Sequence, residues 1–196
     1  MTIFKNYIFL LILSGILIIT SSFYSIDNVC LSWQEMELYN LINSYRNTKG
    51  LNKVNLSKSL TYVAQIHAWD LAENNPDNQR CNMHSWSESK KWEGCCYTSD
   101  HKKAECMWFK PRELTNYTGI GYEVAFYSTY LSDHKNFPLA ALQAWKKSKG
   151  HNDILINDDD WKGLSWEAMG VGIYKNYAVV WFGNEVDEEK KPDQCF

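Results

Sequence analysis

The chain has 196 residues, 45% of them hydrophobic, and this length fits one domain that can bury a substantial core. Its formal net charge is −3, with 20 basic and 23 acidic residues. This balance excludes the strongly basic face of a nucleic-acid-binding protein, so no nucleic acid partner is expected.

The first residues are typical of an export signal. Lys5 supplies a positive start, an apolar run covers residues 7–20, and small residues follow as far as Ser22. The alternative is an uncleaved membrane anchor, but the run is shorter than the roughly 20 apolar residues of a spanning helix. We therefore expect residues 1–22 to be a signal peptide, and the mature protein to be secreted or held in the cell envelope without a stable membrane anchor.

The mature chain is expected to form a single domain over residues 23–183. Residues 184–196 are expected to form a C-terminal tail, in which the charged run 185–191 is solvated. Two helices are predicted at the start of the domain. Ser32 and Glu35 form a capping box before an apolar stripe that Gly50 closes.

The second predicted helix opens near Ser57 and ends at the Asn-Asn-Pro sequence of residues 74–76. His67 lies on its inner apolar stripe, where the simplest interpretation is a core histidine with satisfied hydrogen bonds. Residues 77–118 follow as a long irregular stretch. A loop of this length in a compact domain is typically functional or cross-linked.

Cysteine usage indicates disulfides, because an even number of cysteines lies in an exported chain. The six candidates are Cys30, Cys81, Cys95, Cys96, Cys106 and Cys195. Their spacing favours a Cys30–Cys195 pair and two local bridges within residues 81–106, with the local pairing left open. The alternative, a zinc site of four local thiols, is disfavoured because adjacent cysteines do not match the usual ligand spacing.

The rest of the domain is predicted to contain a strand over residues 122–126 and a helix that opens at Pro138, carries Trp145 and ends at Gly150. A hairpin of residues 168–174 and 177–182 follows. Glycines 170 and 172 within a strand indicate close approach of another backbone. Helices followed by mixed helix and strand indicate an α+β fold.

Three polar side chains lie in distinctive local sequences: His84 in Asn-Met-His-Ser, Glu123 in Gly-Tyr-Glu-Val-Ala, and His151 in Trp-x-x-Ser-x-Gly-His. In this order the motifs resemble those of the CAP superfamily (SCP domain), which includes cysteine-rich secretory proteins, antigen 5 and pathogenesis-related proteins. The local sequence around His151 resembles that of the bacterial-type branch of this superfamily. The resemblance covers residues 35–183 and implies a three-layer α-β-α sandwich, here cross-linked by disulfides.

The resemblance implies a cleft formed by His84, Glu123, Ser148 and His151. Ser148 stands where the family has a second glutamate, and a hydroxyl cannot act as a base, so no catalytic residue is assigned. Strand alternation puts the Glu123 side chain opposite its two neighbours, and a buried carboxylate needs partners such as the histidines. His84 and His151 are the expected metal ligands for Zn²⁺ or another divalent cation, bound weakly with two protein nitrogens.

The expected function is a non-enzymatic extracellular binding module. Its cleft would hold a divalent metal or a small apolar, sterol- or lipid-like ligand, or the module would bind an extracellular partner. No Gly-x-Ser-x-Gly sequence supplies a nucleophile. The alternative is a zinc-dependent, peptidase-like hydrolase in which His84 and His151 hold the ion and Glu123 activates a water.

Overall fold

The computed structural model describes residues 26–129 and 135–195, and the expected signal peptide, 1–22, lies outside these residues. The helices are α1 (Trp33–Thr48), α2 (Lys58–Asn74), α3 (Ala104–Trp108), α4 (Lys110–Leu114), α5 (Phe137–Lys147) and α6 (Lys149–Ile156), with short 3-10 helices at Ile26–Asn28 and Asp159–Trp161. The strands are β1 (Cys30–Leu31), β2 (Asn55–Leu56), β3 (Gly121–Tyr127), β4 (Ala168–Tyr174), β5 (Tyr177–Gly183) and β6 (Asp193–Gln194).

A four-stranded sheet lies at the centre of the domain, with strand order β2-β4-β5-β3. β4 and β5 form the predicted antiparallel hairpin, β3 pairs antiparallel with β5, and β2 pairs parallel with β4. β1 and β6 form a separate parallel pair. β3 is therefore an edge strand of the central sheet, and Glu123 lies in it opposite Trp181 of β5.

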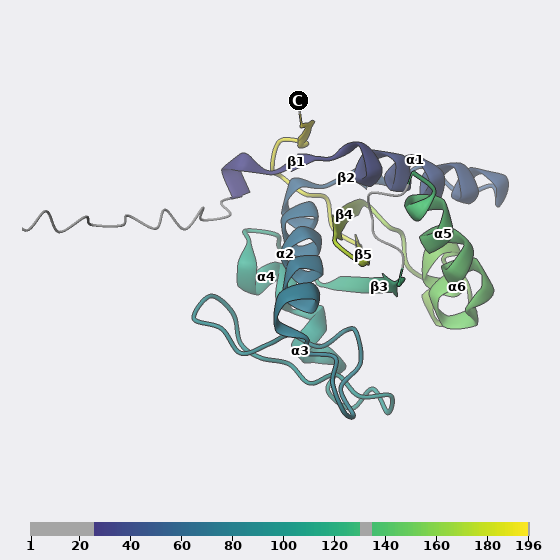
Figure 1. The fold of residues 1–196 in the computed structure, drawn as a ribbon. Coiled ribbons are helices and arrows are strands. Elements are labelled where there is room, and N and C mark those ends of the chain that lie inside the picture. Colours follow the sequence, from purple (N-terminus) through teal and green to yellow (C-terminus); the bar gives the residue numbers. More distant parts are fainter. Residues whose placement is uncertain (1–25, 130–134, 196) are drawn as a thin grey trace, which may run out of the picture.

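Helices cover both faces of the sheet and give three layers (Figure 1). Alternate residues of each strand face opposite layers, as the pleat requires. In β5, Val180 and Phe182 pack with α1, α5 and α6, whereas Val179 and Trp181 pack with α2 and α3. Each face of the sheet therefore has its own apolar core, and the predicted α+β class is confirmed.

Helix α2 packs directly on the backbone of β4. A Cβ atom built on Gly170 would overlap backbone atoms of Leu60 and Thr61, and one built on Gly172 would overlap Ala64. The prediction of a close backbone approach at these two glycines is therefore confirmed. This contact fixes the height at which α2, which carries His67, lies above the sheet.

The predicted starts of α1 and α2 are also confirmed. Ser32 and Glu35 form the capping box, and Glu35 Oε1 also accepts hydrogen bonds from Gln65 and from the Ile173 backbone. Ser57 caps α2 through the backbone N–H of Leu60. Glu35 thus joins α1, α2 and β4.

The prediction that Gly150 ends the helix carrying Trp145 is wrong. α5 ends at Lys147, Ser148 is the extended junction, and a new helix, α6, begins at Lys149 and contains both Gly150 and His151. His151 therefore lies in the first turn of α6, at the positive end of its dipole. A helix that ended at Gly150 would instead place His151 at a helix C-terminus, beside the negative end of the dipole.

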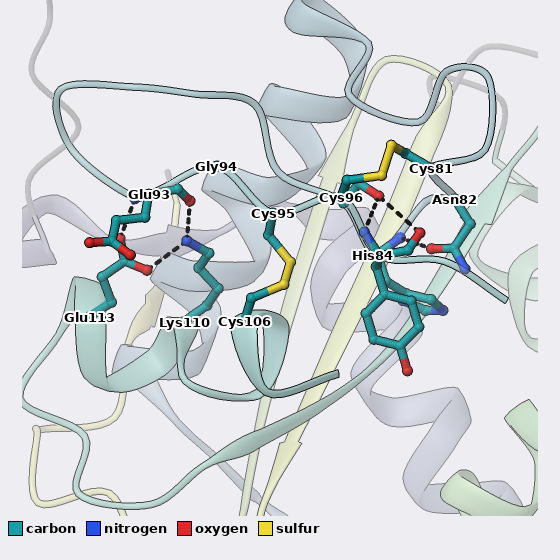
Figure 2. The surroundings of a disulfide bond; sticks show 12 residues. Cys81, Asn82, His84, Glu93, Gly94, Cys95, Cys96, Cys106, Lys110 and Glu113 are labelled. Carbon is teal, nitrogen blue, oxygen red and sulfur yellow. Dashed lines mark hydrogen bonds and ion pairs between the residues drawn. A yellow bond between two sulfur atoms is a disulfide. The ribbon is translucent and has the colours of Figure 1, made fainter. Parts of the chain in front are cut away.

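The long segment of residues 77–118 is less irregular than predicted, because it contains α3 and α4. Disulfides join Cys81 to Cys96 and Cys95 to Cys106, while Cys30 pairs with Cys195. All six cysteines are in disulfides, which confirms the predicted long-range pair with two local bridges and rules out a thiol zinc site. Figure 2 shows the two local disulfides, with Cys95–Cys106 next to Lys110 and Cys81–Cys96 next to His84.

Lys110 holds the same segment by polar contacts. Its ammonium group is buried and donates to the Glu93 carbonyl at 2.5 Å and to the Glu113 carboxylate at 2.6 Å. It also lies 5.3 Å from the centre of the Trp86 ring. Trp86 and Trp92 are core residues. The segment is therefore attached to the domain by disulfides, polar contacts and buried aromatic rings.

Most charged residues of the run 185–191 are exposed, as expected, but hydrogen bonds also attach this segment to the domain. Asp187 accepts hydrogen bonds from Ser57 and Ser59 at the start of α2. The Glu185 carbonyl accepts a bond from the Tyr117 hydroxyl at 2.6 Å. Within the described part of the chain, no helix is both long and apolar enough to span a bilayer.

Candidate functional site

Glu123 is a buried carboxylate between two histidines. It is 2% exposed and projects from β3 toward α2, opposite Tyr122 and Val124, which pack in the other layer. Its Oε2 contacts His67 Nδ1, and its Oε1 lies 2.7 Å from His84 Nδ1. Both oxygens therefore have partners, as a buried carboxylate requires.

His67 carries a positive charge in this arrangement. Its Nδ1 faces Glu123, and its Nε2 lies 2.9 Å from the Ser85 carbonyl oxygen. Both neighbours accept hydrogen bonds, so both ring nitrogens donate, which requires the imidazolium form. The ring also stacks on Trp86 at 4.2 Å.

The pKa shifts agree with this ion pair. Burial acts to lower the pKa of His67, but the Glu123 carboxylate more than offsets it, and the pKa lies above its usual value. Burial acts to raise the pKa of Glu123, but the charge and hydrogen bonds of His67 and His84 hold it below the usual value. Glu123 is therefore ionised at neutral pH.

His84 is positioned by the disulfide-closed loop. Cys81 and Cys96 close this loop, and the backbone N–H of His84 donates to Asn82 Oδ1 at 3.0 Å (Figure 2). With Nδ1 bonded to Glu123, Nε2 of His84 has no hydrogen-bond partner among the residues that the structure describes. A carboxylate on one imidazole nitrogen is the usual outer partner of a metal-binding histidine.

His151 faces His84 across the cleft, with ring centroids 6.3 Å apart. Burial, and then the neighbouring His84, lower the pKa of His151 to about 4. Its position in the first turn of α6 acts in the same direction, because a helix N-terminus disfavours positive charge. His151 is therefore neutral at pH 7, with a lone pair on one ring nitrogen.

A cavity of about 520 Å³ joins these residues. Its lining includes His84, Glu123, Ser148 and His151, so all four residues predicted for the cleft line the same cavity. Ser148 contributes no side-chain cap to α6. Within residues 26–129 and 135–195, no three His, Cys, Asp or Glu side chains form a group that could hold a metal ion.

His67 is a member of the site that was not predicted from the sequence. His67 was correctly predicted to be a core residue, but its partner is the same carboxylate that holds His84. The signal was present: a histidine on a buried helix stripe needs polar partners, and Glu123 lies on the strand face toward that helix. The aromatic side of the cleft, with Trp108, Tyr122 and Trp161, was also missed.

A family model described as CAP, the cysteine-rich secretory protein family, matches residues 39–181. Comparison with curated proteins gives no match. Among solved structures, the fold is similar to an extracellular protein containing an SCP domain from Bacillus anthracis, with a TM-score of 0.53 and 18% identity. An outer surface protein from Borrelia burgdorferi has a TM-score of 0.50 and 18% identity.

These matches cover 78% of this chain, but 40% of the Bacillus anthracis chain and 92% of the Borrelia burgdorferi chain. This chain therefore spans less than half the length of the first of these proteins. At this identity the likeness concerns the fold alone. The three-layer sandwich that the sequence motifs implied is therefore confirmed as the fold.

Proposed function

Because this chain belongs to the cysteine-rich secretory protein (CAP) family, whose model matches residues 39–181, we propose that it is an extracellular binding module. It holds a small ligand in the cleft between His84 and His151 and does not transform it. Extracellular location is supported by three disulfides, which persist in oxidising compartments. The amino-terminal apolar run supports secretion through a cleaved signal peptide.

The observation that carries this proposal is the bonding of Glu123. Both of its oxygens are engaged, one by the His67 imidazolium and one by His84. A carboxylate fixed in this way stabilises the cleft and is a weak base, because both partners favour its ionised form and hold its pKa below the usual value. The position where the family pattern has a second carboxylate is occupied by Ser148. A binding role therefore fits this residue set better than the hydrolase alternative does.

The same geometry supports weak binding of a divalent cation such as Zn²⁺ by His84 and His151. A Zn–N bond is about 2.0–2.1 Å and a ring nitrogen lies about 1.1 Å from the ring centre, so two imidazoles that share a tetrahedral zinc ion have centroids roughly 5.2 Å apart. The observed separation is 6.3 Å, so the two rings would have to approach each other by about 1 Å to share the ion. With two nitrogens and solvent as ligands, affinity is modest. When bound, the ion would supply an electrophilic centre at the cleft floor.

A small apolar ligand is the second occupant that we propose for the cleft region. Beside His151, on the side away from Tyr122, lies a second hollow of about 440 Å³. Its walls include Met83, Phe126, Trp145 and Tyr177, which are apolar or aromatic. Such a surface suits a lipid-like chain, whose burial stabilises binding by about 0.8 kcal/mol per CH₂ group.

Calorimetric titration of the mature protein tests the proposal with zinc chloride, a sterol and a fatty acid as probes. We expect zinc binding at micromolar or weaker affinity, lost in His84→Ala and in His151→Ala. His101→Ala is the matched control, because this imidazole also lines the cleft but is bonded to the Tyr97 hydroxyl at 2.9 Å.

Two results would contradict the proposal. One is the absence of heat with divalent ions, sterols and fatty acids alike. The other is peptide hydrolysis by the zinc-loaded protein that is lost in His151→Ala, which would favour the hydrolase alternative.

A further inference from the structure

The wall of the cleft opposite His84 has a distinctive charge. Asp153, Asp159 and Asp160 all line the cavity on the side formed by α6 and the 3-10 helix after it. No lysine or arginine is among the described residues that line the cavity. The cavity is therefore complementary to a cation.

Aromatic rings line the same part of the cavity. Trp108, Tyr122 and Trp161 come from three separate elements and are all partly exposed to the hollow. The ring centroids of Trp108 and Tyr122 are 5.6 Å apart, and those of Tyr122 and Trp161 are 4.6 Å apart, with steep interplanar angles in both pairs. Both pairs are in edge-to-face contact, so the three rings form one aromatic surface on the cavity. The faces of aromatic rings attract cations, and tryptophan is the strongest of them.

The side chain of Lys149 already places an ammonium group beside two of these aspartates. Lys149 Nζ lies 2.7 Å from Asp153 and 2.5 Å from Asp159. This leaves Asp160, which is exposed and has no ion pair within the described part of the chain. Three carboxylates therefore lie near one lysine, and this side of the cavity keeps a net negative charge.

We propose that the aromatic end of the cleft binds a small organic ammonium ion. Trp108, Tyr122 and Trp161 contact its alkyl groups and Asp160 supplies the counter-charge. The inference rests on the proposed binding function and names a ligand class for the same cavity. It differs from the metal proposal because it uses rings and carboxylates about the mouth of the cavity instead of the imidazole nitrogens.

Other ligand classes fit this end of the cavity less well. An anion would meet three aspartates and no cationic side chain among the lining residues described. A bare metal ion would leave most of a cavity of about 520 Å³ unfilled and would gain nothing from the alkyl-binding surface of the rings. A neutral apolar molecule would leave the Asp160 carboxylate to be desolvated without compensation.

The test uses choline and its uncharged isostere 3,3-dimethyl-1-butanol, which have nearly the same shape. Calorimetry of the mature protein at low ionic strength is expected to give at least tenfold tighter binding of choline. Raising the salt concentration is expected to weaken choline binding, because the rim charges are exposed.

Two variants, each with a matched control, test whether choline binds at the aromatic end of the cleft. Trp161→Leu is expected to weaken choline binding roughly two- to thirtyfold, the range for loss of one cation–π contact. Asp160→Asn is expected to weaken choline binding and leave the isostere unaffected. Trp33→Leu and Asp193→Asn, at exposed positions away from the cleft, are expected to bind as wild type.

Equal affinity for choline and the isostere would overturn this inference, and so would unchanged choline binding in both cleft variants. A zinc titration of the same samples separates the two proposals. Zinc binding that is retained without choline binding overturns only the ammonium site. Absence of both, together with no heat from a sterol or a fatty acid, in protein whose near-ultraviolet circular dichroism is native, overturns the binding function as well.

Discussion

At the scale of single residues, the buried ion pair of Glu123 and His67 decides which groups in the cleft are free to act. The pair is fully enclosed, so removing one member leaves an uncompensated buried group. Loss of one partner of such a pair typically costs about 3–5 kcal/mol. The pair also fixes His84, because the second oxygen of the same carboxylate accepts a hydrogen bond from His84 Nδ1.

Glu123→Gln is therefore expected to lower the free energy of unfolding by about 3–5 kcal/mol at pH 5.5, measured by urea denaturation. The exposed Glu105→Gln in α3 is the matched control and should lie within about 0.5 kcal/mol of wild type. A Glu123→Gln protein as stable as the control would show that the pair contributes nothing to stability.

The cost of Glu123→Gln should also depend on pH. The pKa of Glu123 is lowered by folding, so its contribution is complete above the unfolded value of 4.5 and is lost as pH falls through the folded value. The pKa of His67 is raised by folding, so its contribution is complete below 6.5 and is lost as pH rises through the folded value. The difference between wild type and variant should peak between these pH values, and a flat profile from pH 3 to 9 contradicts this.

The sequence predicted much of the site at this scale, because strand alternation and local motifs indicate where Glu123, His84 and His151 project. It could not reveal that the first partner of Glu123 is His67. That contact depends on how far α2 is turned and shifted along the sheet, which no local pattern contains. The aromatic wall was missed for the same reason, since Trp108, Tyr122 and Trp161 come from segments far apart in the chain.

At the scale of elements, the backbone contact between α2 and β4 controls the position of His67. Gly172 touches the backbone of Ala64, which lies one turn before His67. Backbone atoms cannot give way as a flexible side chain can. A methyl group at this position must therefore move the helix away from the sheet.

Gly172→Ala is accordingly expected to lower the free energy of unfolding by at least about 1–3 kcal/mol, the usual cost of overpacking. Thermal or urea unfolding measures the effect. Gly163→Ala is the matched control, because a Cβ atom at Gly163 meets nothing within 4 Å. If both variants unfold alike, the close packing of α2 on β4 is not a determinant of stability.

The elements that the sequence predicted best have strong local signals: the capped starts of α1 and α2, and the β4–β5 hairpin. Its errors lie where such signals are short or ambiguous. α3 and α4 have five residues each, too few to display helical periodicity. Gly150 was predicted to be a helix end. The helix instead ends before Ser148, which has an extended backbone, and Gly150 lies in the first turn of α6.

At the scale of the whole molecule, disulfides and the C-terminal segment hold the periphery of the sandwich. Cys30–Cys195 joins residues 165 positions apart and lies beside the β1–β6 pair. The two local bridges close loops of 15 and 11 positions. The long-range pair followed from the sequence because these two cysteines are remote from the other four, whereas spacing could not choose between the local pairings.

In the chain-entropy model, a disulfide stabilises more when it closes a longer loop. Replacing Cys30 and Cys195 together by serine should therefore cost about 2 kcal/mol more than replacing Cys81 and Cys96, given the ratio of the two separations. Urea unfolding of the two double variants, with all remaining thiols oxidised, measures this difference. An equal or opposite ranking would mean that native strain or local packing outweighs the entropy of the chain.

The separation of Cys30 from Cys195 has a consequence for biogenesis. A polypeptide threaded amino-terminus first into an oxidising compartment presents Cys30 together with four other thiols well before the native partner arrives. Early oxidation there joins the wrong sulfurs, and only thiol–disulfide exchange can release them. Yield in a recombinant host should accordingly depend on a disulfide isomerase, and a chain that lacks both Cys30 and Cys195 should depend on it less.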